Sequence, residues 1–355
     1  MWRKALAPIL GATASVLLGI DQTGAAENFN VKTLVPTFGG ATSVGANVST
    51  ILALRLWTTL RPRPNPNPNN LFFGVGQIEW SERVIEDSPD AALQVANETR
   101  SHLALWGSVE EYGRGVVVTA SLAVPTGQAV LRARQTWTVT VQDIRLELGV
   151  PNSSYQFSPL VLTSDVVAKY SRPNQVRICQ NKDPNCNGPA LRAPFRAIKL
   201  EGDFILVRQP NGSIGWAPLP NLSEAQGEVV DFTAALISYL RGDFEQAESY
   251  FSKVRDSNAE SLVRNDASLL GGISRFRRGQ GIDALRTAQR QNRYSRYGVQ
   301  ALVMADIAAA AAVDSSESRA PHLKEAGELI ASYRHLFDPG DRWLADVDRS
   351  LRILN

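Results

Sequence analysis

A pattern of small and aromatic side chains that occurs twice in the second half of the chain most constrains its fold. Residues 234–251 carry these side chains at helical spacing on both sides of Gly242 and Asp243, which predicts two short helices joined by a tight turn. The pattern returns 37 positions later, where Ala235, Tyr239, Gly242 and Ala247 are replaced by Gly272, Phe276, Gly279 and Ala284. Helical pairs that repeat at this period stack into solenoids, and solenoids commonly bind other proteins.

These residues and their spacing resemble the tetratricopeptide repeat. The resemblance implies that the first helix of each pair faces a concave groove. It places six side chains there: Phe232, Leu236, Tyr239, Leu269, Ile273 and Phe276. An apolar groove of this kind suits an extended or helical peptide from a partner protein. The alternative is that the chain fills its own groove, with its last helix at 341–353 or with the β-barrel domain expected at 155–222.

Helical periodicity continues from Glu228 to the end of the chain, so residues 226–355 are assigned to an all-α repeat domain. Pro321 and Pro339 are expected at helix starts, where proline is tolerated. The helices are expected at 229–241, 244–256, 259–278, 281–291, 297–312, 321–336 and 341–353.

The first 26 residues have the order of a secretory signal peptide. A basic start at Arg3 and Lys4 precedes an apolar run from Ala5 to Ile20, and small residues follow up to Ala26, after which cleavage is expected. The run is shorter than the roughly 20 residues of a membrane span. An uncleaved membrane anchor is the alternative. The prediction is a periplasmic or secreted protein with no membrane span after the signal is removed.

Residues 28–150 alternate between strand and helix signals. Strands are expected at 31–38, 71–80, 103–109 and 116–124, and helices at 47–60 and 90–101, which gives the order βαβαββ of a small α/β domain. The segments Ser101–Val109 and Gly115–Leu122 resemble the TolB-type amino-terminal domain of bacterial envelope proteins. The resemblance implies a role in assembly and contact rather than catalysis.

Residues 155–222 contain closely spaced short strands separated by Gly, Pro and Asn, which predicts a small all-β barrel. Strands are expected at 166–170, 175–178, 202–208 and 212–217. The order Gly-Asp-Phe at 202–204 and Gly-Trp-Ala at 215–217 resembles the bacterial Src-homology-3 domain, which implies contact with cell-wall peptide or another protein. Trp216 is a candidate binding residue in this domain, with a place in the core as the alternative.

The two cysteines, Cys179 and Cys186, lie seven positions apart around a polar turn. In an oxidising compartment this spacing predicts one local disulfide, worth about 2.5 kcal/mol from loop entropy. Free thiols are the alternative. A metal site is not expected, because no histidine lies nearby in the sequence.

Charge composition argues against a nucleic-acid partner, because the formal net charge is only +2. A local exception is the segment 275–296, which carries seven arginines and one acidic residue, Asp283. Guanidinium groups suit carboxylate or phosphate, so this segment is a candidate contact for an anionic partner. The four candidates for this contact are Arg277, Arg278, Arg293 and Arg296. The alternative is that these arginines form a solvated helix face.

Catalytic, cofactor and metal motifs are not recognisable. The histidines, His102, His322 and His335, have neither triad nor ligand spacing. The glycine turn at 39–40 lacks the Lys-Ser/Thr of a nucleotide-binding loop. No enzyme activity and no cofactor are therefore expected.

The sequence as a whole predicts an exported, multidomain, non-enzymatic adaptor or scaffold, with a protein or peptide partner held by the repeat groove and the β domain. Two alternatives stay open. One is an accessory protein that binds or remodels peptidoglycan, and the other is a component of an envelope secretion or assembly machine.

Overall fold

The computed structural model describes residues 31–40, 42–60, 78–85, 88–113, 115–125, 136–163, 177–183, 185–191, 196–201, 204–209, 211–218, 227–291 and 295–355, and every structural statement below refers to them. They form two compact units, each described by itself. The larger comprises the described residues of 31–137 and 148–301, and the smaller comprises 138–147 and 302–355.

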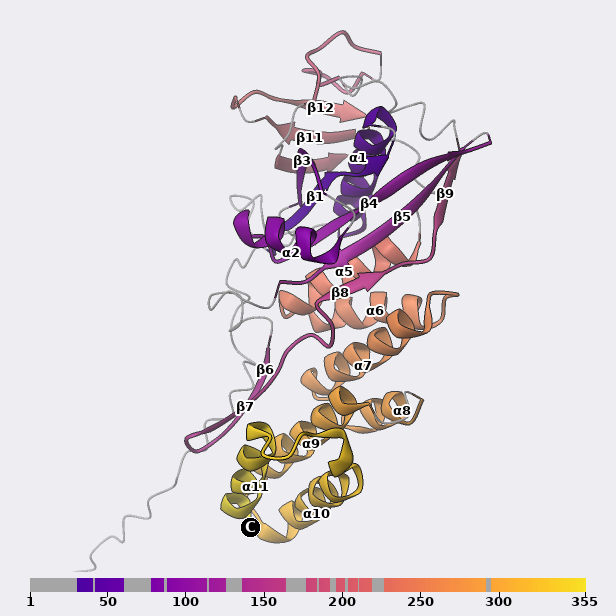
Figure 1. Ribbon diagram of the computed structural model, residues 1–355. Coiled ribbons are helices and arrows are strands. Elements are labelled where there is room, and N and C mark those ends of the chain that lie inside the picture. The colour runs from indigo at the N-terminus through magenta and orange to yellow at the C-terminus, as the bar shows by residue number, and fades with distance from the viewer. Residues whose placement is uncertain are drawn as a thin grey trace, which may run out of the picture. The chain divides into compact units, whose positions relative to one another are not determined.

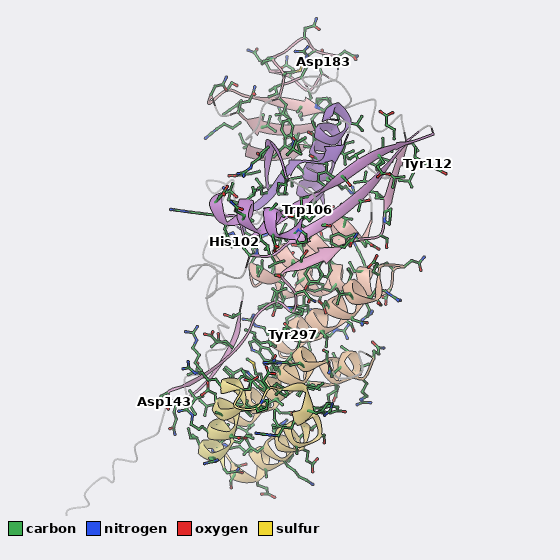
Figure 2. The ribbon with its side chains drawn as sticks, in the orientation of Figure 1. His102, Trp106, Tyr112, Asp143, Asp183 and Tyr297 are labelled. Carbon is green, nitrogen blue, oxygen red and sulfur yellow. A yellow bond between two sulfur atoms is a disulfide. The ribbon has the colours of Figure 1, made fainter. Side chains whose placement is uncertain are left out.

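A mixed β-sheet is the centre of the larger unit. Its strands are β1 (Thr33–Thr37), β2 (Gly39–Gly40), β3 (Ile78–Val84), β4 (Leu103–Tyr112), β5 (Gly115–Ala123), β8 (Ser154–Gln156) and β9 (Leu160–Thr163). β1 runs parallel to β3 and β4, and β4 is antiparallel to β5. β5 in turn pairs with β8 through one half and with β9 through the other. The expected strand order along the chain is thus present, and Figure 1 shows the long β4–β5 hairpin with β8 and β9 beside it.

Two helices accompany this sheet, α1 (Thr42–Thr59) and α2 (Pro89–Glu98). α2 begins where the Ser88 hydroxyl accepts a hydrogen bond from the Ala91 amide, and its apolar face packs on Leu34 and Trp106. In β4, Gly107 is required by close packing, because a Cβ there would lie 2.0 Å from the Thr119 carbonyl oxygen. Glycine in this strand is therefore a packing requirement of the β4–β5 pair.

A second, antiparallel sheet contains β10 (Arg196–Glu201), β11 (Phe204–Arg208) and β12 (Ile214–Pro218). The segment around Cys179 extends it, since the Cys179 amide donates to the Trp216 carbonyl and the Trp216 amide donates to the Cys179 carbonyl. Cys179 and Cys186 form a disulfide. The predicted strand at 166–170 lies outside the described residues, and the described strands β10, β11 and β12 form a three-stranded sheet.

The second half of the chain is helical. The helices are α5 (Glu228–Leu240), α6 (Phe244–Arg255), α7 (Ser261–Arg277), α8 (Asp283–Gln291), α9 (Arg296–Ala311), α10 (Ser316–Tyr333) and α11 (Arg342–Leu354), with a short 3-10 turn, η2 (Arg334–Leu336). Figure 1 shows α5, α6, α7 and α8 following one another in consecutive layers.

The two predicted helical pairs share their turn geometry. Gly242 follows α5 with a φ of 78°, and Gly279, 37 positions later, follows α7 with a φ of 79°. This left-handed conformation is the usual way for a helix to end, and it favours glycine. After Gly242, the Asp243 side chain accepts a hydrogen bond from the Gln246 amide and begins α6.

The start of α10 differs from the prediction, as does that of α1, which begins at Thr42 rather than at 47. α10 begins at Ser316, where the Ser315 hydroxyl accepts a hydrogen bond from the Ser318 amide. Pro321 therefore lies inside the helix rather than at its start. The serine cap decides the start, and the missing amide of Pro321 removes one backbone hydrogen bond from the second turn.

Most of a β-hairpin within the first half of the sequence, residues 138–147, belongs to the smaller unit, while its end residues Trp137 and Leu148 belong to the larger one. The hairpin consists of β6 (Trp137–Val141) and β7 (Ile144–Leu148), and alternate residues, among them Val139, Val141, Ile144 and Leu146, are buried. Contacts group residues 138–147 with the C-terminal helical residues 302–355. In the same unit Asp306, fully buried on α9, lies 3.1 Å from Nδ1 of His322 on α10.

Candidate functional site

The six side chains predicted to line a groove lie together on one face of α5 and α7, which we call the inner face. They are Phe232, Leu236, Tyr239, Leu269, Ile273 and Phe276. Five of them are at most 3 % exposed, and Phe276 is half-buried. The inner face is therefore not open to solvent.

Two aromatic side chains of the inner face, Phe232 and Phe276, pack against residues from the first half of the chain, whereas Tyr239 packs on Phe244 and Phe251 of α6. Phe232 lies with its ring centroid 4.6 Å from that of Tyr155 and 5.9 Å from that of Phe157. Phe276 contacts Trp137 at 5.5 Å between ring centroids. The predicted groove is thus closed by the chain itself.

The closing segment is Gly149–Ser158, which we call the strap, and it includes β8. Its polar contacts reach three alternate helices of the chain. The Ser158 amide donates to Glu228 at the start of α5 (2.6 Å), Asn152 donates to Asp266 on α7 (2.6 Å), and the Tyr297 hydroxyl on α9 donates to the Gly149 carbonyl (2.7 Å). The strap therefore lies across α5, α7 and α9 in the way that an extended peptide would.

The occupant differs from both alternatives considered from the sequence. Neither the last helix, α11, nor the small β-sheet supplies these contacts; the strap does. The sequence analysis assigned residues 28–150 and 155–222 to different domains, so it divided this segment between them. Tyr155 and Phe157, spaced by two, are the signal that could have identified a buried strand there.

Asp266 is the most unusual ionisable group of this region. Its side chain is 95 % buried between α7 and the strap. Burial raises the pKa of its carboxyl group to about 6, and the Asn152 amide and the nearby Tyr155 hydroxyl offset part of the rise. Burial likewise raises the pKa of Tyr155, and the adjacent Asp266 carboxylate adds to this effect. Hydrogen bonding to a neutral amide in a closed interior indicates a structural role rather than proton transfer to a substrate.

Trp216 is half-buried in β12. The Lys182 ammonium group, from the turn closed by the disulfide, lies 4.8 Å from the centre of its ring and also pairs with Glu201. A cation over an indole ring is attracted by the ring's negative face. The side chain is therefore neither fully in the core nor an uncovered platform.

The predicted anion-contact arginines have different surroundings. The Arg277 guanidinium lies 4.1 Å from the centre of the Phe244 ring, and Arg278 donates to Glu248 at 2.8 Å. Arg296 is exposed at the start of α9, and Arg293 lies outside the described residues. Arg275, which belongs to the same arginine-rich segment but not to the four named candidates, also pairs with Glu248.

A pocket of about 390 Å³ lies between α6, α7 and α8, and we call it the outer groove. Its walls include Glu248 and Arg255 of α6, Gly271 and Arg275 of α7, and Thr287 of α8. On α7 these residues fall on the side away from Leu269 and Ile273, since 3.6 residues complete one helical turn. This surface is separate from the inner face that the strap covers.

The remaining candidates have structural explanations. Nδ1 of His102 accepts a hydrogen bond from the Lys32 amide, which joins the starts of β1 and β4. In the glycine turn, the Phe38 amide donates to the Ser49 hydroxyl, and a Cβ on Gly45 would lie 2.1 Å from the Phe38 carbonyl oxygen. The turn is a tight connection whose amide is already bonded.

In the described part of the chain, no group of three or more His, Cys, Asp and Glu side chains is arranged to hold a metal ion. Among the helices described, none combines the length and the apolar character that crossing a membrane requires. The predicted signal peptide at 1–26 lies outside the described residues.

Comparison with known proteins gave no match: no family model, no curated protein and no solved structure is significantly similar to this chain.

Proposed function

We propose that this chain is an exported, non-enzymatic adaptor that holds partner proteins on its helical repeat and its small β-sheet. The observation that carries the proposal is the binding of the strap across α5, α7 and α9 through aromatic contacts and hydrogen bonds. A repeat that holds an extended segment in this way has the chemistry of a peptide-binding scaffold. The disulfide supports export, because such bonds persist in oxidising compartments.

The strap also determines which surfaces are offered to a partner. Because it covers the inner face, partners meet the outward surfaces, namely the outer groove and the β10–β12 sheet. Thr287 is exposed in the outer groove, and Ile214 on β12 is 49 % exposed. These two residues mark the two proposed contact surfaces.

Site-specific photo-cross-linking in the cells that produce the protein tests the proposal. A benzophenone amino acid at Thr287 or Ile214 should give discrete adducts with a protein that also co-purifies with the unmodified chain. The control position is Lys324 on α10, whose side chain is 76 % exposed. Absence of adducts at both positions, or identical adducts at Lys324, would refute the adaptor function.

A peptidoglycan-directed role is the second candidate, and the half-buried Trp216 with Lys182 above it favours that role. An aromatic ring with adjacent charged groups suits a sugar-peptide polymer. Binding to purified cell-wall sacculi should then be lost in Trp216→Ala and kept in Trp343→Ala, a tryptophan on α11. Sacculus binding that survives Trp216→Ala would exclude the β-sheet as its cause.

A further inference from the structure

The outer groove is formed by matching faces of three helices. Its wall residues recur at intervals of three and four: 248, 251, 252 and 255 on α6; 267, 268, 271, 272 and 275 on α7; and 283, 284, 287, 288 and 291 on α8. From Glu248 to Arg255 the helix rises about 10 Å, which is the length of about three extended residues. The volume of about 390 Å³ is within the range of about 300–1,000 Å³ that is usual for ligand sites.

The floor of the outer groove contains adjacent glycines, and helix packing explains one of them. A Cβ on Gly272 would lie 3.0 Å from the Leu285 Cα, so close contact between α7 and α8 requires glycine there. A Cβ on Gly271 would lie 3.4 Å from the Phe251 Cβ, which is an ordinary contact. A glycine within a helix costs about 1 kcal/mol relative to alanine. Helix packing therefore does not explain the glycine at position 271. The missing side chain of Gly271 leaves space at the floor of the groove.

One end of the outer groove carries positive charge. Glu248 is the shared partner of Arg275 and Arg278, so these three side chains have one net positive charge. Arg275 bonds Glu248 through Nε, which leaves the terminal nitrogens of its guanidinium as donors. The N-terminus of α8 lies at the same end. Its first residue, Asp283, is paired with Arg286, so this ion pair leaves the net charge of that end unchanged.

The rest of the lining consists of small or apolar residues and of uncharged polar ones, apart from Arg255 and Asp283. Ser252, Ser268, Gln280, Thr287 and Gln291 supply hydroxyl and amide groups. Such groups can donate to and accept from the amides of an extended backbone. Arg255 is already bonded through two nitrogens to Asp256, so it competes less strongly for a ligand carboxylate than Arg275 does.

We propose that the outer groove binds a segment of about three small residues from a partner protein, with a carboxylate of that segment held by Arg275. The inference rests on the proposed adaptor function and adds the chemistry of its ligand. The carboxylate comes either from an acidic side chain or from a free C-terminus, because the guanidinium fork accepts both.

Three tripeptide probes distinguish these sources. Acetyl-Gly-Ser-Gly has a free C-terminal carboxylate, acetyl-Gly-Ser-Asp-amide has a side-chain carboxylate, and acetyl-Gly-Ser-Asn-amide has neither. With alanine methyl groups labelled for NMR, the methyl signals of Ala267, Ala284 and Ala288 should shift, since these residues line the groove. The fully buried Ala235 should not shift.

We expect millimolar dissociation constants for one or both acidic probes and at least about tenfold weaker binding of the neutral probe, since one charge-assisted hydrogen bond contributes about 1.5 kcal/mol or more. Arg275→Gln should reduce binding of the acidic probes to the level of the neutral probe. Arg290→Gln, an exposed arginine of α8 outside the groove lining, should not change it.

Substitutions of Gly271 separate a loss of probe binding from misfolding of the protein. Gly271→Ala should raise the melting temperature and weaken probe binding, while Gly271→Leu should abolish binding with the Ala235 signal unchanged. Four outcomes would each overturn the proposal. They are equal binding of all three probes, NMR shifts outside the groove, no binding of any probe, and full binding by Gly271→Leu. Photo-cross-links from Thr287 that persist after such a result would leave the adaptor function standing without this ligand.

Discussion

The side-chain amide of Asn152 donates a hydrogen bond of 2.6 Å to the carboxylate of Asp266, and the two residues are 114 positions apart in the sequence. This bond joins the strap to α7. Asp266 thereby links the helical repeat to a segment from the first half of the chain. The ionisation of its carboxyl group should therefore affect the free energy of unfolding.

Stability should depend on pH through Asp266. Its folded-state pKa, about 6, is above the ordinary value of 3.8, so the folded state binds the proton more tightly than the unfolded state. The free energy of unfolding contributed by this group is therefore highest below about pH 4 and falls as pH rises to about 6, by about 3 kcal/mol in total. Urea denaturation from pH 4 to 8 should show this decline, and Asp266→Asn should flatten it.

Asp256→Asn is the matched control for this pH series. Asp256 is exposed, and the hydrogen bond from Arg255 lowers the pKa of its carboxyl group. Removing the Asp256 carboxyl group should leave the fall in the free energy of unfolding between pH 4 and 6 in place. A decline that persists in Asp266→Asn would assign the pH dependence to another group.

Phe232→Ala should destabilise the larger unit by about 3–5 kcal/mol, because a fully buried ring that contacts Tyr155, Phe157 and Phe251 leaves a cavity. Leu262→Ala, at a side chain that is 49 % exposed, should change stability by about half a kcal/mol or less. Chemical denaturation measures both. A Phe232→Ala protein with unchanged stability would mean that the inner face is open after all.

Gly107→Ala should destabilise the β4–β5 hairpin by about 3 kcal/mol, because the new Cβ meets the Thr119 carbonyl oxygen and the Phe38 ring. Gly39→Ala is the comparison, since a Cβ there has its nearest neighbour at 3.8 Å. Melting temperatures should fall for the first variant and change little for the second. The reverse order would contradict the close approach of β4 and β5.

Replacing both cysteines by serine should lower stability by about 2.5 kcal/mol, since the disulfide closes a short loop. The turn should also become more sensitive to proteases, because Lys182 is held over Trp216 by this loop. Limited proteolysis with mass spectrometry measures the effect. A reductant should reproduce the change in the wild-type chain and have no further effect on the double variant.

Local features of the fold follow from the sequence. Gly242 and Gly279 end their helices in the same left-handed conformation, and Asp243 begins the next helix, because these residues act through their own backbone and nearest neighbours. The β4–β5 hairpin and the disulfide are equally local. Pro321 shows the limit of such reasoning: a serine cap six residues earlier decided where α10 begins.

The candidate site depended on contacts that no local pattern encodes. The periodicity of α5 and α7 determined that Phe232 and Ile273 share an apolar face, but not what covers that face. Tyr297 bonds Gly149 across 148 positions, and Asn152 bonds Asp266 across 114. Any apolar surface of suitable shape could have buried those side chains, since the hydrophobic effect is not directional. Only the tertiary structure decided that the strap lies there and that Gly271 faces an open groove on the other side of α7.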